Sequence, residues 1–136
     1  MRKNQTLAAL AFAAAGFSFL TVGPALAAAP QPAKEIAAAA QHAGLAAQGT
    51  TLKEVQTHLH HTVNCLVGPE GEGFAPKELN PCSTLGNGAI PDTTDAAKKK
   101  ALQAALEEAQ DGLGEDDLAD AKEDAVKTQT LLDALK

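Results

Sequence analysis

The segment that most constrains this chain is residues 51–67, because it combines a strong helical period with most of the histidines. Its sequence is TLKEVQTHLHHTVNCLV, which holds three of the four histidines. Apolar residues recur in it every three or four positions, and this spacing places side chains on one face of an α-helix. They are Leu52, Val55, Leu59, Val63 and Leu66. We predict a helix over this segment, with its apolar face toward the core.

A second stripe along the same helix carries metal-ligating side chains. Its members are Glu54, His58, His61 and Cys65, spaced four, three and four residues apart. A helix aligns them on one side, on the order of 130° from the centre of the apolar face, whereas His60 projects elsewhere. Two neutral imidazoles one turn apart can bind Cu(II), Ni(II) or Zn(II), and a nearby carboxylate can add a ligand. We predict a metal site at His58 and His61, assisted by Glu54 and turned away from the core.

His42 is a further candidate ligand, on the preceding predicted helix at residues 33–48. An antiparallel hairpin places it at the height of His58 or His60, but the pattern does not fix which side of its helix faces them. The alternative for all these histidines is that they cap the loop or face solvent without a metal.

The two cysteines predict one disulfide, between Cys65 and Cys82. Closing a loop of this length contributes about 3 kcal/mol by the chain-entropy estimate. Because Cys65 belongs to the ligand stripe, the bond would hold the following loop over His58 and His61 as a lid.

Residues 1–27 have the features of a cleavable secretory signal. Basic Arg2 and Lys3 precede an apolar run, and Ala25-Leu26-Ala27 provides a small-residue cleavage site. We predict cleavage after Ala27, a periplasmic or secreted location, and no membrane association after cleavage.

The remaining chain, residues 28–136, predicts one all-α domain. A hairpin at 33–67 and a hairpin at 93–136 flank a glycine- and proline-rich loop at 68–92. An offset of 66 residues superposes most apolar positions of the two hairpins, such as Ile36 on Leu102. We predict a four-helix up-and-down bundle in which the disulfide tethers the long loop.

The ends of the helices also have sequence signals. Thr51 and Glu54 form a capping-box pattern at the start of the second helix. The third helix is predicted to be capped at 92–94 and to end at Gln110, and Gly112 and Gly114 are predicted to form the turn before the last helix.

Composition excludes several functions. Without the signal the formal charge changes from -6 to about -8, and the mature chain has no arginine and one aromatic residue, Phe74. Nucleic acid is therefore not an expected partner.

No C-x-x-C-H motif occurs and Met1 is the only methionine, which excludes covalent haem attachment and methionine-ligated haem. The hydrolase and phosphate-binding motifs G-x-S-x-G, H-E-x-x-H and the P-loop are also absent, so we expect no enzyme.

The HA-x-x-A segment at His42, the alanine-rich hairpins and the pair His58 and His61 resemble the bacterial periplasmic small metal-binding proteins. The resemblance implies an exported four-helix bundle that binds copper and other divalent ions. It covers the helices only. The chain departs from that family in having four histidines rather than a histidine-dense repeat, and in carrying Cys65 and Cys82.

The sequence thus favours an exported, non-enzymatic protein that binds copper, nickel or zinc through helix histidines. The alternative is a structural or protein-interaction module that uses the 64–92 loop and binds no metal.

Overall fold

Five α-helices make up the secondary structure of residues 29–136, the part of the chain that the computed structural model describes, and no strand occurs in that part. The predicted signal at 1–27 lies outside the described residues. The helices are α1 (Pro32–Gln48), α2 (Leu52–Val67), α3 (Ala89–Asp92), α4 (Ala96–Gly114) and α5 (Leu118–Asp133). Within residues 29–136, no helix is both long enough and apolar enough to cross a membrane.

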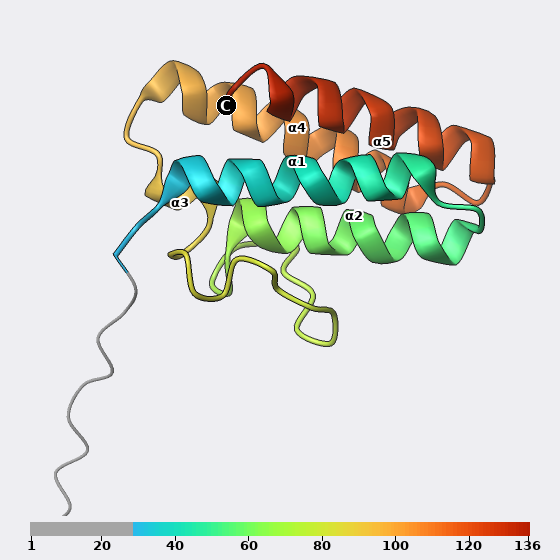
Figure 1. Cartoon of the computed structure of the whole chain (residues 1–136), viewed down its shortest axis with the longest axis horizontal. Helices are drawn as coiled ribbons and strands as arrows, with labels where there is room; N and C mark the ends of the chain where they lie inside the picture. The colour runs from blue at the N-terminus through green and yellow to red at the C-terminus, as the bar shows by residue number, and fades with distance from the viewer. Residues whose placement is uncertain (1–28) are drawn as a thin grey trace, which may run out of the picture.

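The four long helices pack as a four-helix bundle. Helix α1 contacts α2 and α5, and α4 contacts the same two helices, so that the contacts form a closed ring. Figure 1 shows that successive long helices run in opposite directions and that the long connection between α2 and α4 lies along α2. The short helix α3, which the sequence did not predict, forms within that connection.

The predicted capping box at the start of α2 is confirmed. The Thr51 hydroxyl accepts a hydrogen bond from the Glu54 backbone N–H at 3.2 Å, and the Glu54 carboxylate accepts from the Thr51 N–H at 3.2 Å. At the end of α1, the Gly49 N–H donates to the Ala46 carbonyl at 2.9 Å. These bonds define the short turn between α1 and α2 and keep the two helices adjacent.

The core is narrow because most of its side chains are small. Its largest fully buried apolar residues are Ile36, Leu59, Leu66, Leu102 and Leu132. Most of the rest are alanines, which bury little area each but allow neighbouring helices to approach closely. Stability must therefore come from crosslinks and buried hydrogen bonds as well as from apolar area.

The predicted end of the third helix is wrong. Helix α4 continues past Gln110 to Gly114, so Gly112 and Gly114 lie inside it. Gly112 is buried, and a Cβ there would lie 2.8 Å from Leu59 Cδ1, so glycine serves close packing rather than a turn. The turn follows Gly114 and leads to Asp117, whose side chain caps α5.

The long connection is fixed to the bundle at several points. The predicted disulfide joins Cys65 on α2 to Cys82 in the loop. Beside it, the Asn64 side chain donates to the Ala75 and Leu79 carbonyls at 3.1 Å each and accepts from the Ala75 N–H at 2.8 Å. These bonds hold the 75–79 turn against α2.

The end of the connection is fixed to α1 by a buried carboxyl group. Glu35 is completely buried, and its Oε1 accepts a hydrogen bond from the Gly88 N–H at 3.0 Å, whereas its Oε2 has no partner among the described residues. Burial raises the pKa of Glu35, the Gly88 hydrogen bond opposes that rise, and the Asp92 charge adds to it.

Removing the disulfide should destabilise the fold. The bond spans 17 residues, and for a loop of that length the unfolded chain gains entropy worth about 3 kcal/mol when the link is lost. We expect a Cys65→Ala, Cys82→Ala variant to lose about this much unfolding free energy in urea denaturation followed by circular dichroism. An unchanged midpoint would show that the crosslink does not stabilise the bundle.

Glu35 should make stability fall as pH rises. Because the folded state holds the Glu35 proton more tightly than the unfolded state, whose pKa is near 4.5, its contribution is full below that value and is lost as pH rises through the folded pKa. The unfolding free energy of a Glu35→Gln variant, relative to that of the natural chain, should therefore increase from pH 4 to pH 7. Urea midpoints at both pH values test this, with Asp111→Asn on the exposed surface as control. A Glu35→Gln effect that is equal at both pH values would contradict it.

Candidate metal centre

Three imidazoles meet between α1 and α2. His42 comes from α1, and His58 and His61 come from α2. One nitrogen of each ring lies within 4.8 Å of the corresponding nitrogens of the other two, and the Nδ1 atoms of His42 and His58 are 3.3 Å apart. This is the only group of three or more histidine, cysteine or carboxylate ligands that meets this distance among residues 29–136. The structure thus joins the predicted pair to His42.

The packing of α1 on α2 brings His42 to the pair. Ala39 and Ala43, on either side of His42 along α1, are fully buried, and their small side chains let the two helices approach closely. Between the helices, the buried Thr62 hydroxyl lies 3.2 Å from the Ala39 carbonyl and 3.1 Å from the His58 carbonyl, and can donate its one proton to either. This contact fixes the height of His42 relative to His58.

The spacing of the nitrogens suits a transition-metal ion. With metal–nitrogen bonds of about 2.0–2.1 Å, two ligands of a tetrahedral site are about 3.3–3.4 Å apart. The His42 and His58 Nδ1 atoms already have this separation. His61 meets the other two rings edge to face, with centroids 5.0 and 5.5 Å away. Small side-chain rotations would bring its nitrogen to the same ion.

The environment keeps two of the three rings neutral. Burial, and to a lesser extent the neighbouring His61 and His58, lower the pKa of His42 to about 4. Burial also lowers the pKa of His61, as do the charges of His58 and His60, whereas the Glu78 carboxylate opposes the change. Because neutral imidazole is the form that binds metal, these two rings require no deprotonation at pH 7.

The ligand stripe of α2, predicted to be turned away from the core, is buried in its second half, whereas Glu54 is exposed and His58 is half-buried. His61 is 8 % exposed and Cys65 is fully buried. Both lie next to the anchored loop, because Cys65 is bonded to Cys82 and Asn64 holds the 75–79 turn. His61 Nδ1 is buried and has no hydrogen-bond partner among the described residues. This nitrogen is thus available to a ligand that the protein itself does not supply.

Glu54 is not part of this cluster, in contrast to its predicted assisting role. Its Oε2 accepts hydrogen bonds from the Thr50 N–H and hydroxyl at 2.8 Å each and from the Thr51 N–H, at the exposed start of α2. Hydrogen bonds to Thr50 are the main cause that lowers the pKa of Glu54. The capping-box pattern already indicated this role, and a carboxylate that closes the helix end is not free to turn toward His58.

His60 also lies outside the cluster, as its position on the helical wheel predicted. Its Nδ1 is buried without a hydrogen-bond partner in the described part of the chain. His60 therefore provides a matched control, being a histidine of the same helix that the structure leaves out of the triad.

A scan against protein-family models, a search of curated proteins and a search of solved structures each found no match to this chain.

The low pKa of His42 can be measured directly. In a proton NMR titration of the metal-free protein, we expect the His42 ring to titrate near pH 4. Replacing both neighbours, as His58→Gln and His61→Gln, should raise this pKa because two nearby charges are removed. The value should stay below 6.5, since burial is the larger cause. A His42 pKa near 6.5 in the natural chain would show that the ring is not buried as described.

Proposed function

We propose that the protein binds one divalent transition metal ion through His42, His58 and His61. The observation that carries this proposal is the convergence of three imidazole nitrogens within 4.8 Å, on two helices that pack directly together. Helices hold ligands more precisely than loops do, so little ordering is needed when the ion binds.

The ligand set favours Cu(II), Ni(II) or Zn(II). Imidazole nitrogen is a borderline ligand that suits these ions, whereas Ca²⁺ and Mg²⁺ prefer oxygen. The two cysteines form a disulfide with each other, so neither offers a thiolate, and Met1 is the only methionine. The chain therefore has few soft ligands for Cu(I). We propose that Glu78, which attracts His61 electrostatically, or a water molecule completes the coordination.

We further propose that the ion is carried rather than used in catalysis. Open zinc sites with three protein ligands do activate water in enzymes. In this protein, however, His61 is 8 % exposed between two helices and next to the anchored loop. That burial supports holding an ion more than exposing it to a substrate.

Export is a further part of the proposal. A disulfide in a small domain is typical of oxidising compartments, and a narrow alanine-rich core benefits from the crosslink. Together with the predicted signal at 1–27, this supports a periplasmic or secreted location.

One observation favours the alternative function as an interaction module. Leu79 is 62 % exposed on a turn that Asn64 holds rigidly, so the 64–92 loop presents an apolar side chain in a fixed position. In that case the loop would bind a protein partner and metal would be irrelevant.

Calorimetric titration of residues 28–136 with Cu(II), Ni(II) and Zn(II) tests the metal proposal. We expect one equivalent to bind with submicromolar affinity for at least one ion. His42→Ala should weaken that binding at least about tenfold, because it removes one of three ligands.

Two control variants separate the triad from nearby groups. His60→Ala and Glu54→Gln should each retain the natural affinity, since neither side chain belongs to the cluster. The proposal fails if all three variants bind as the natural chain does, or if His60→Ala is as harmful as His42→Ala.

A further inference from the structure

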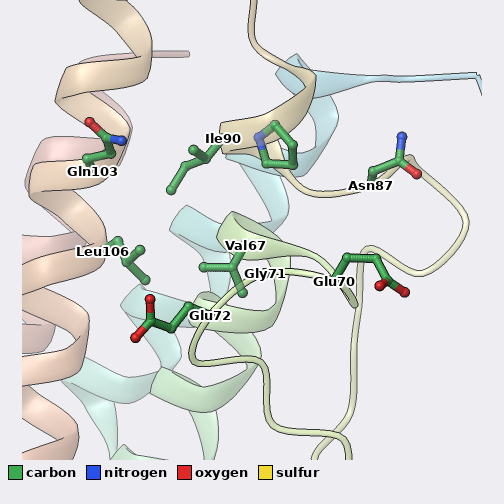
Figure 2. A pocket seen from close by; sticks show the side chains of 9 residues that line it. Val67, Glu70, Gly71, Glu72, Asn87, Ile90, Gln103 and Leu106 are labelled. Carbon is green, nitrogen blue, oxygen red and sulfur yellow. The ribbon is translucent and has the colours of Figure 1, made fainter.

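A second feature of the bundle, a pocket of about 350 Å³, lies where the long connection passes between α2 and α4. Its apolar walls are Val67 at the end of α2, Ile90 and Pro91 in α3, and Leu106 on α4. Figure 2 shows the side chains of Val67, Ile90 and Leu106 pointing into the same space. This volume falls within the range of about 300–1,000 Å³ that is typical of small-molecule sites. No histidine lines the pocket, so it is separate from the metal centre.

The walls of this pocket are fixed by the backbone of the connection. The backbone at the start of the connection touches the backbone near its end. A Cβ on Gly68 would lie only 1.6 Å from the Asn87 carbonyl oxygen. Asn87 itself is held by Asp92, whose carboxylate accepts from the Asn87 N–H at 2.7 Å and from its side-chain amide at 3.0 Å. The adjacent Gly88 N–H is bonded to the buried Glu35. A ligand would therefore find the walls already in place.

The edge of the pocket is acidic. Glu70 and Glu72 line it and are exposed, together with the amides of Gln103 and Asn87. A neighbouring hollow shares Glu72, Gln103 and Leu106 and adds Glu107 and Gln110. No lysine or arginine lines either hollow. A ligand that fills the apolar space and approaches these carboxylates thus gains from carrying a positive charge.

We propose that this pocket binds a small organic amine, with its apolar body between Val67, Ile90 and Leu106 and its ammonium group at the acidic rim, where Glu70 and Glu72 lie on opposite sides (Figure 2). Burial of the apolar body supplies most of the affinity. The carboxylates supply the selectivity, because they favour a cation over a neutral or anionic analogue of the same shape. This function is independent of the metal centre.

Three adamantane derivatives of equal shape and different charge test the proposal. They are adamantan-1-amine, which is protonated at pH 7, adamantan-1-ol and adamantane-1-carboxylate. Binding is followed by NMR of the methyl groups of Val67, Ile90 and Leu106, since the chain has no tryptophan or tyrosine for fluorescence. We expect the amine to bind about fivefold more tightly than the alcohol, a factor suited to exposed ion pairs, and the carboxylate to bind most weakly.

Variants assign the selectivity to the rim. Glu70→Gln with Glu72→Gln should abolish the preference for the amine and leave binding of the alcohol unchanged. Asp111→Asn with Asp116→Asn removes the same amount of charge from exposed positions outside the pocket and should retain the preference. The proposal is overturned if the three methyl groups respond to none of the probes. It is also overturned if the three probes bind equally, or if both double variants lose the preference alike.

Discussion

The close packing of α1 against α2 is the contact on which the rest of the structure depends. Small, fully buried side chains, among them Ala39 and Ala43, let the two helices approach, and Thr62 fixes their relative height through the Ala39 carbonyl. The same contact that forms half of the core thus brings His42 to His58. A longer side chain in place of Ala39, whose carbonyl contacts Thr62, would disturb this packing and, with it, the spacing of the imidazole nitrogens.

The sequence predicted the helical hairpins well because their signals are local. The capping box at Thr51, the apolar period of residues 51–67 and the pairing of Cys65 with Cys82 need no knowledge of distant contacts, and all are confirmed. The offset of 66 residues also corresponds to the structure, since it carries α2 (Leu52–Val67) onto α5 (Leu118–Asp133). At this offset His58 and His61 correspond to Asp124 and Lys127, which form an ion pair with atoms 3.0 Å apart.

The features that the sequence did not predict depend on which helix faces which. A helical wheel places His58 and His61 on one side of α2, but only the packing of α1 shows that His42 faces them. Gly112 was assigned to a turn because glycine commonly ends helices, whereas its function is to admit Leu59. Glu54 illustrates competition between two local patterns, ligand spacing and helix capping. Capping prevailed because the three donors it satisfies are adjacent in the chain.

Two rings of the triad, His42 and His61, have lowered pKa values, so that at the proposed site geometry weighs more than protonation in setting affinity. Protons compete with metal ions for the same lone pairs, but at a ring with a pKa of about 4, such as His42, this competition is weak at pH 7. A divalent ion would in turn bring charge into a region where desolvation already disfavours charge, so it must be compensated by short bonds to several ligands at once. Three nitrogens held by two packed helices would provide such compensation, whereas a single histidine at the same depth would not. The alanine-rich interface that weakens the core is therefore the same feature that makes a metal site between α1 and α2 physically reasonable.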